Sequence, residues 1–440
     1  MATTPQEAIR DADKHVSFLD DHYETVDTQD FWLHSQNVAR VVEPTQALAK
    51  LFVLPLEPRG SDNRHFNLRF FLIGSHQIWD GLTTFVWLRD LVHNLNKSED
   101  ALKAQLATLL DKKTLPDRLP LPQEALYPPI SGSRFANPLL RRSAALLGPV
   151  APPSPTYAAV LCYSKTPPLS SAPVFAKVSP RNTQRLHRLC REAKASIGAG
   201  CFALAALVMM EIHEALTPGI PLSERKPFVS LYGAFFSHHN DPDSLMLAFS
   251  DGIALPFLSA ELDLDGRIRL LARQAHRQLA SYQKRSQPAE KAAELQYMSS
   301  RGAGRVLANQ YISSVERSNA LLPEQLRKNI NPQGEYPMRP NMTTQTCGVS
   351  SVGRRDAFIK QGMYDLNDNA KDLVADFRDT AASVRPREGE FLVGIGSTDD
   401  GLGVSVSVDG SSMDPALVSQ WKDRLEHVLD EDNKAEKARL

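Results

Sequence analysis

The stretch LRFFLIGSHQIWDG, residues 68–81, decides the fold predicted for this chain of 440 residues. Its first half is a run of large apolar side chains, which is typical of a buried strand. Its second half places His76, Asp80 and Gly81 in the pattern His-x-x-x-Asp-Gly directly after that run. A loop that only joins two elements has no need of an imidazole at the end of a core strand, so the pattern indicates a functional site.

The elements around this stretch are predicted from the spacing of apolar side chains. Residues 52–58 and 67–73 are expected to be strands. Residues 81–95, GLTTFVWLRDLVHNL, predict a helix, although Arg89 falls within its apolar side. The apolar residues on that side are Leu82, Phe85, Val86, Leu88 and Val92.

His76 is the residue that carries the predicted chemistry. Imidazole takes a proton from an alcohol near neutral pH because both of its protonation states are accessible there. Asp80 and Gly81 are expected to shape the turn rather than to touch a substrate. Such a pattern arises by chance in on the order of 4% of sequences of this composition. A polar core histidine is therefore the alternative interpretation.

Composition and charge bound the class of protein. Hydrophobic residues make up 42% and charged residues 23%, as in an average soluble globular protein. The length suits two domains of roughly 200 residues each. A net charge of -1 gives no general attraction to nucleic acid or to an acidic membrane. The four scattered cysteines form no CxxC pair, which indicates free thiols in a reducing compartment.

We expect a cytoplasmic protein without a membrane span. The first residues are polar and mixed in charge, unlike a secretory signal. The longest apolar stretch, 197–210, is shorter than the ~20 residues that a bilayer requires, so it predicts a core helix. Ala438-Arg439-Leu440 has the small-basic-leucine pattern of peroxisomal signals, which makes peroxisomal import an alternative to a plain charged tail.

Prolines mark the predicted domain boundary. Fourteen of the 30 prolines lie between Pro116 and Pro180, where they prevent a long regular element. The predicted division is therefore an N-terminal domain at 1–115 with the motif, a Pro-rich crossover at 116–178 and a C-terminal domain at 179–440.

The C-terminal domain is expected to mix strands and helices, which fits α/β layers. Residues 200–215 are apolar nearly all round and predict a helix buried between layers. The other expected elements are a helix at 179–196, strands at 226–236 and 343–353, a hairpin at 391–410 that turns at Asp400-Gly401, and a helix after Asp414-Pro415.

The motif and this layout resemble the chloramphenicol acetyltransferase-like superfamily. That superfamily includes plant BAHD acyltransferases, condensation domains of nonribosomal peptide synthetases, and fungal trichothecene and alcohol O-acetyltransferases. The motif from His76 to Gly81 carries the resemblance. LPQEALYPPI (121–130), the helix that opens at SPRNTQRLHRLC (179–190) and the terminal strand pair with its helix agree with the family layout.

The resemblance implies two similar α/β lobes, with mixed sheets and flanking helices, and a tunnel between them. The acyl donor, usually a coenzyme A thioester, would enter from one side and the acceptor from the other. His76 would be the general base, Asp80 and Gly81 would be structural, and Trp79 would line the tunnel or pack in the core. Neither a covalent acyl-enzyme nor a permanently bound cofactor is expected.

Two departures narrow the family branch. Ser75 stands where peptide-synthetase condensation domains have a first histidine, which weakens the peptide-bond alternative. DFRDT (376–380) keeps only the first two residues of the BAHD motif Asp-Phe-Gly-Trp-Gly, and Asp376 is expected to keep a structural role. The fungal O-acetyltransferase branch fits best.

Hydroxyl groups that stabilise an oxyanion are expected on the strand at 343–353, from Thr346, Ser350 and Ser351. Alternate side chains of a strand point to opposite faces, so not all three can face the tunnel. SHHNDPD (237–243) matches no zinc or calcium spacing and is interpreted as a solvated turn, so no metal site is expected. The absence of a P-loop, a Gly-x-Ser-x-Gly elbow and a dinucleotide fingerprint disfavours those chemistries.

We expect a monomeric, acyl-CoA-dependent O-acyltransferase that acts on a hydroxylated secondary metabolite such as a terpenoid or a polyketide. Two alternatives stay open. One is a condensation-type enzyme that takes its acyl group from a carrier protein and forms an ester or an amide. The other is a two-lobed protein that binds a ligand without catalysis.

Overall fold

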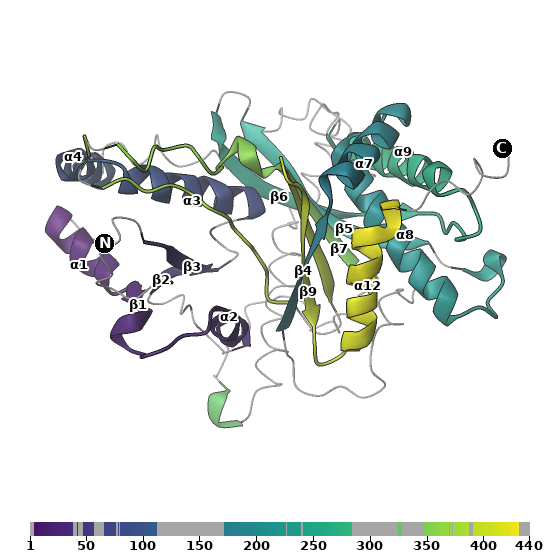
Figure 1. Ribbon diagram of the computed structural model, residues 1–440, viewed down its shortest axis with the longest axis horizontal. Helices are drawn as coiled ribbons and strands as arrows, with labels where there is room; N and C mark the ends of the chain where they lie inside the picture. The colour runs from purple at the N-terminus through teal and green to yellow at the C-terminus, as the bar shows by residue number, and fades with distance from the viewer. Residues whose placement is uncertain are drawn as a thin grey trace, which may run out of the picture. The chain divides into compact units, whose positions relative to one another are not determined.

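The fold was determined from a computed structural model (Figure 1). Much of the predicted Pro-rich crossover and the C-terminal Ala438-Arg439-Leu440 lie outside the described residues. The residues that the structure describes are 4–37, 42, 47–56, 66–75, 78, 80–111, 171–225, 227–238, 241–283, 324–327, 347–368, 370–371, 373–386 and 390–430.

The chain divides into two compact units, and each is assembled from separated segments. Unit 1 comprises Met1–Pro120, Phe236–Met246 and Arg354–Ala381. Unit 2 comprises Leu121–Phe235, Leu247–Gly353 and Ala382–Leu440. The division into 1–115, 116–178 and 179–440 remains a prediction.

Unit 1 contains a three-stranded sheet in the order β1-β2-β3. β1 runs parallel to β2, and β2 runs antiparallel to β3, with Phe52 opposite Phe71. Phe71 is buried, and the ring of Phe31 packs 4.8 Å from it, centroid to centroid. The elements of this unit are α1 (Pro5–Asp13), β1 (Val16–Phe18), α2 (Thr28–Asn37), β2 (Ala49–Pro55), β3 (Leu68–Gly74), α3 (Gly81–Leu95) and α4 (Glu99–Leu110).

A segment from the far end of the sequence, Arg354–Ala381, belongs to unit 1 and lies along α3 (Figure 1). The rings of Phe85 and Phe358 stack with centroids 6.4 Å apart. Asn96, at the C-terminal end of α3, donates to the Ala375 carbonyl at 2.7 Å and accepts from the Ala375 N–H at 3.1 Å. The helix that begins at the motif is therefore held at both its buried side and its end.

Unit 2 contains most of a six-stranded sheet in the order β4-β9-β8-β7-β5-β6, whereas the end of β5 and the start of β6, Phe236–Met246, belong to unit 1. β9 pairs antiparallel with both β4 and β8, whereas β7 runs parallel to β5. This mixture of strand directions, together with flanking helices, confirms the predicted α/β class. The strands are β4 (Ser171–Val178), β5 (Phe228–His238), β6 (Asp241–Leu255), β7 (Cys347–Arg354), β8 (Phe391–Thr398) and β9 (Gly401–Asp409).

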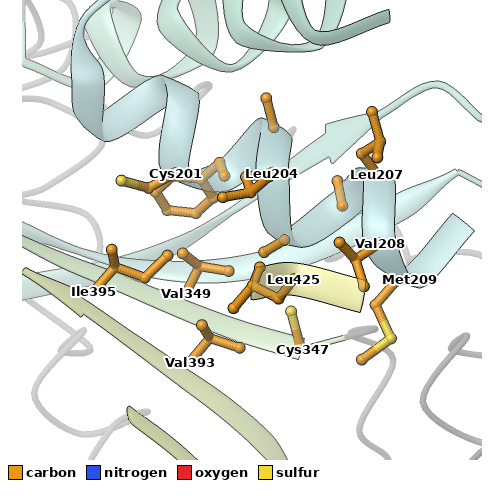
Figure 2. Packing of buried hydrophobic residues seen from close by; sticks show 14 of the residues in the cluster. Cys201, Leu204, Leu207, Val208, Met209, Cys347, Val349, Val393, Ile395 and Leu425 are labelled. Carbon is orange, nitrogen blue, oxygen red and sulfur yellow. The ribbon is translucent and has the colours of Figure 1, made fainter. Parts of the chain in front are cut away.

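The core of unit 2 lies between this sheet and its helices. Figure 2 shows Leu204 and Val208 of α8 against Val349 of β7, Val393 of β8 and Leu425 of α12. All five side chains are buried, and the same face of β9 presents a further row of buried valines. The helices are α7 (Pro180–Glu192), α8 (Ile197–Leu216), α9 (Leu264–Gln283) and α12 (Pro415–His427).

The central helix α8 explains the longest apolar stretch of the sequence. Residues 199–212 are all buried, as the sequence predicted for a helix between layers. Among the described helices, α8 alone is long and apolar enough to cross a membrane, and 78% of its apolar window is buried inside the protein. The burial is that of a core helix.

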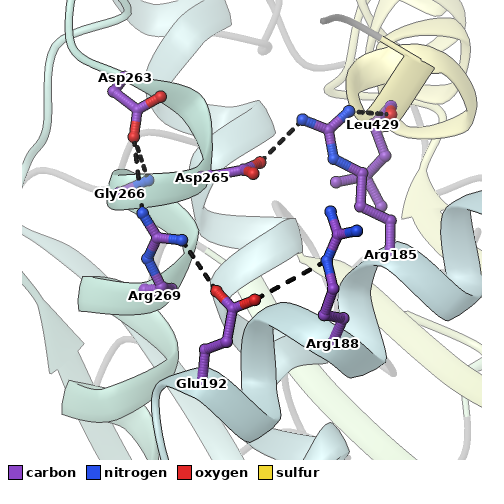
Figure 3. A network of polar contacts seen from close by, with 8 residues as sticks. All are labelled: Arg185, Arg188, Glu192, Asp263, Asp265, Gly266, Arg269 and Leu429. Atoms are coloured by element: carbon purple, nitrogen blue, oxygen red, sulfur yellow. Dashed lines mark hydrogen bonds and ion pairs between the residues drawn. The ribbon is translucent and has the colours of Figure 1, made fainter. Parts of the chain in front are cut away.

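Ion pairs join α7 to α9 at the surface of unit 2 (Figure 3). Arg185 contacts Asp265 at 2.8 Å with one guanidinium nitrogen and donates to the Leu429 carbonyl at 2.6 Å with the other. Arg269 lies 2.9 Å from the Glu192 carboxylate. These contacts bind two helices and the chain that follows α12 into one layer.

The predicted hairpin of β8 and β9 is present, and its turn is formed by Asp399 and Asp400, directly before Gly401. Thr398 pairs with Gly401, and Gly401 has a φ of +115°, a value that favours glycine because other side chains are strained there. A side chain at position 401 would also collide with the carbonyl of Val178. The turn therefore requires glycine for two independent reasons.

The end strand β4 has a partly blocked outer edge. Pro173 lacks a backbone N–H, and the N–H of Lys177 donates to Glu426 of α12 at 2.9 Å. β4 lies within the predicted Pro-rich crossover. The strand tolerates Pro173 because a proline at an edge strand disturbs no hydrogen bond of the sheet. The prolines are therefore the reason why β4 was not predicted from the sequence.

Candidate functional site

The motif follows β3 in unit 1. The Ser75 N–H donates to the Leu48 carbonyl at 2.8 Å, and the Ile78 N–H donates to the Ser75 carbonyl at 3.1 Å. The chain thus leaves the sheet and enters a tight turn as soon as β3 ends. His76 and Trp79 lie outside the described residues, so their predicted roles remain predictions.

Asp80 caps the helix that follows this turn. One of its carboxylate oxygens accepts from the Leu82 N–H at 2.9 Å and from the Thr83 N–H at 2.8 Å. Its backbone carbonyl accepts from the Thr84 hydroxyl at 2.8 Å. Asp80 is only 6% exposed, so these bonds form largely away from water. The geometry is that of an N-cap, which satisfies N–H groups that have no partner within the helix.

The position of Gly81 follows from this cap. Gly81 is the first residue of α3, and the helix runs from there to Leu95. The pattern His-x-x-x-Asp-Gly therefore encodes a strand end, a turn and a capped helix in that order.

Asp376 holds a second loop of unit 1. Its carboxylate accepts from the backbone N–H groups of Gly362, Met363 and Tyr364, at 2.6, 3.1 and 3.2 Å. The Tyr364 hydroxyl in turn lies 2.9 Å from Nδ1 of His93 on α3. Asp376 thus folds the loop that contacts α3, and its partners are backbone donors rather than a cationic side chain.

The predicted oxyanion donors are on or beside β7 in unit 2. Ser350 is exposed and lies on the face of the sheet opposite the buried Cys347 and Val349. Ser351 is half-buried on the helix-covered face, where it hydrogen-bonds the thiol of Cys201. The two hydroxyls point to opposite faces, so they cannot serve one passage together. Thr346 lies outside the described residues.

The described cysteines are in surroundings that suppress thiolate formation. Burial raises the pKa of Cys190 to about 11 and that of Cys201 to about 12, and it also raises the pKa of Cys347. A thiol acts as a nucleophile through its thiolate, which these three do not form near neutral pH. Cys162 lies outside the described residues.

The histidine-rich stretch at 237–243 joins two strands. β5 ends at His238 and β6 begins at Asp241, while 239–240 and the side chains of this stretch lie outside the described residues. Elsewhere in the described chain, no group of three His, Cys, Asp or Glu side chains gathers in a way that would hold a metal ion.

Comparison with known proteins supports the fold by structure and not by sequence. No family model and no curated protein matches the sequence. The structure is similar to that of TRI3 trichothecene 15-O-acetyltransferase from Fusarium sporotrichioides, with a TM-score of 0.56 and 13% identity over 97% of this chain and 78% of that chain. The starter condensation domain of rhizomide synthetase matches with a TM-score of 0.45 and 12% identity, over 95% of this chain and 77% of that chain.

The likeness to the trichothecene acetyltransferase extends over almost the whole chain. The α/β fold expected from the superfamily resemblance is therefore confirmed. At 13% identity the comparison supports the fold alone. The tunnel between the lobes and the residues that line it remain predictions.

Proposed function

We propose that this protein is an acyltransferase that moves an acyl group from coenzyme A to a hydroxyl of a secondary metabolite. The single observation that carries the proposal is the pattern His76-x-x-x-Asp80-Gly81 placed between β3 and α3, with Asp80 buried as the helix cap. This observation stands in a fold similar to that of a trichothecene 15-O-acetyltransferase.

In the proposed reaction His76 is the general base. Its neutral imidazole takes the proton of the acceptor hydroxyl, and the oxygen attacks the carbonyl carbon of the thioester. The tetrahedral oxyanion then collapses, the carbon–sulfur bond breaks, and the thiol of coenzyme A leaves with the proton held by His76. The acyl group ends as an ester of the acceptor, and the enzyme returns to its starting state.

Direct transfer requires no covalent intermediate on the protein. The raised pKa values of Cys190, Cys201 and Cys347 support this part of the proposal, because none of these thiols is an effective nucleophile near neutral pH. The reaction then depends on the base and on the placement of two substrates.

Donors for the oxyanion are the second element of the proposal, and exposure separates the candidates. Ser350 offers an exposed hydroxyl on the open face of β7, whereas Ser351 is engaged with Cys201 under the helix layer. Ser350 is therefore the better candidate of the two described serines. Removing such a donor is expected to lower turnover and leave substrate binding unchanged.

The proposal is tested by thiol release from acetyl-CoA with a panel of hydroxylated terpenoids and polyketides. His76→Ala is expected to lower turnover by ~10² or more, because a positioned base contributes about that factor. His34→Ala, an exposed histidine on α2, is the matched control and is expected to keep full activity. Near-wild-type turnover of a folded His76→Ala variant would remove the base from the proposal.

The acyl donor that the enzyme accepts distinguishes the proposed function from its main alternative. A condensation-type enzyme would turn over an acyl group bound to a carrier protein and would fail with free acetyl-CoA. Ser75, in the place of the first histidine of condensation domains, weakens the alternative in which a peptide bond forms. Binding of the acceptor without turnover of either donor would point to a protein that binds without catalysis.

A further inference from the structure

A small apolar cavity lies in unit 2 between α12 and the end strand β4, two elements that pack side by side (Figure 1). Its volume is about 260 Å³. Ala172 and Val174 of β4 line one side, and Val418 of α12 lines the other. Carbon atoms make up most of its wall, so a ligand that fills it must be largely apolar.

Lys422 contributes the one cationic group of the cavity lining. It follows Val418 by four residues, so the two side chains lie on the same face of α12. Lys422 is half-buried, and it has no hydrogen-bond or ion-pair partner in the described part of the chain. An ammonium group that is partly removed from water without a partner gains from an anion placed beside it.

The acidic residues of α12 nearest to Lys422 are directed elsewhere. Asp414 caps the helix by accepting from the Ala416 N–H at 2.8 Å. Glu426, one turn beyond Lys422, accepts from the backbone N–H of Lys177 at 2.9 Å. Asp423 is exposed. None of these carboxylates pairs with Lys422, so the cation beside the cavity remains available for a ligand.

We propose that this cavity binds a free carboxylic acid with an unbranched apolar tail, with its carboxylate at Lys422 and its tail against Ala172, Val174 and Val418. At ~30 Å³ for each non-hydrogen atom, the volume holds about nine such atoms. A tail of six to eight carbons fits that limit when the carboxylate lies at the half-buried Lys422 and not within the counted volume. The site is formed by unit 2 alone and does not depend on the proposed acyl transfer.

The test uses octanoate as the probe and isothermal titration calorimetry as the measurement, with 1-octanol as a neutral ligand of the same length. Wild-type protein is expected to bind octanoate at a single saturable site. Lys422→Met keeps most of the length of the side chain and removes its charge, so it is expected to weaken octanoate about tenfold and to leave 1-octanol unchanged. Lys177→Met removes an exposed lysine of β4 and is the matched control, with unchanged binding of both ligands.

A second variant tests the cavity itself. Ser419 lines the cavity from an exposed position of α12, so Ser419→Trp fills the space with little effect on the core. This variant is expected to lose both ligands while it keeps the thermal midpoint of the wild type. The proposal is overturned by an absence of saturable binding, by equal loss in the two lysine variants, or by full binding in Ser419→Trp.

Discussion

The carboxylate of Glu211 on α8 lies 2.7 Å from Nη2 of Arg267 on α9, and both side chains are more than nine-tenths buried. The second oxygen of Glu211 accepts from Nε of Arg424 on α12 at 2.6 Å. One carboxylate therefore ties three helices of unit 2 together. Glu211 is the only acidic partner of Arg267 among the described residues.

Glu211→Gln is expected to destabilise unit 2 strongly. The amide keeps the shape of the side chain but leaves two guanidinium groups without their countercharge, which costs about 3–5 kcal/mol for a buried pair. Urea denaturation followed by circular dichroism measures the change in midpoint. Glu192→Gln is the control: Glu192 also contacts arginine but is 44% exposed, so less than about 1 kcal/mol is expected. Equal shifts of the midpoint in both variants would contradict the expectation that burial makes the contacts of Glu211 more stabilising than those of Glu192.

Asp80→Ala is expected to lower the thermal midpoint of unit 1. The substitution removes the acceptor for the Leu82 and Thr83 N–H groups at a buried helix start, at a cost of about 1–2 kcal/mol. Asp80→Asn keeps an acceptor oxygen and should restore most of the loss. Ser98→Ala, which removes the more exposed cap of α4, is expected to cost less. A wild-type midpoint for Asp80→Ala would show that the cap is dispensable.

Gly200→Ala is expected to destabilise the contact between α7 and α8. A methyl group at this position would collide with the Cys190 sulfur, and overpacking of this kind costs about 1–3 kcal/mol. Gly198→Ala is the matched control, because the nearest atom, the Ser351 hydroxyl oxygen, would be 3.8 Å away. Thermal melts of the two variants should differ in midpoint. Adding Cys190→Ala to Gly200→Ala should recover stability, and failure to do so would mean that the sulfur is not the obstacle.

The stability of unit 2 is expected to decrease as the pH is lowered, in part because of His213. Burial and the nearby Arg225 lower the pKa of His213, whose Nδ1 lies 3.0 Å from Nη1 of Arg225. Glu214, the neighbouring acid, opposes this shift, and its carboxylate accepts from the Ser259 hydroxyl and the Ala260 N–H. The folded state therefore binds a proton less readily than the unfolded chain.

Neutral His213 makes its full contribution to the unfolding free energy above the pKa of histidine in the unfolded chain, about 6.5. This contribution is lost progressively as the pH falls below that value. His213→Gln keeps a neutral acceptor for Arg225 and cannot titrate. The difference in unfolding free energy between wild type and this variant should shift against the wild type between pH 7.5 and 5.5. A difference that stays constant over that range would contradict the prediction.

Local signals predicted much of the fold. α3 occupies Gly81–Leu95, the range predicted, because the cap residue and the apolar spacing agree on the same helix. Only Phe85 and Val86 of its five predicted apolar residues are fully buried, and Arg89 pairs with its neighbour Asp90. The pattern located the helix but overstated how much of its surface is covered.

Among the strands that escaped prediction, which include the short β1, two contain residues that resemble those of turns. β4 contains Pro173, and β6 begins with Asp-Pro-Asp at 241–243. Both sequences are typical of loops, and only pairing with a distant strand makes them part of a sheet. The sequence also did not predict that Arg354–Ala381 belongs to unit 1, because this assignment depends on contacts between residues that are far apart in the chain.

The candidate site was predictable to the extent that it is local. The motif is contiguous, so its strand, turn and helix followed from residues 68–95. The partners of Asp376 are backbone N–H groups of Gly362–Tyr364, which leave no mark in the sequence. The opposite directions of Ser350 and Ser351 required the register of β7 within the sheet.

The blocked edge of β4 bears on how the protein behaves at high concentration. A strand from a second molecule that approached this edge would meet Pro173, which offers no donor, and the Lys177 N–H, which Glu426 already engages. Intermolecular sheet growth, the usual first step of fibril formation, is therefore opposed at this end of the sheet by two residues only four positions apart.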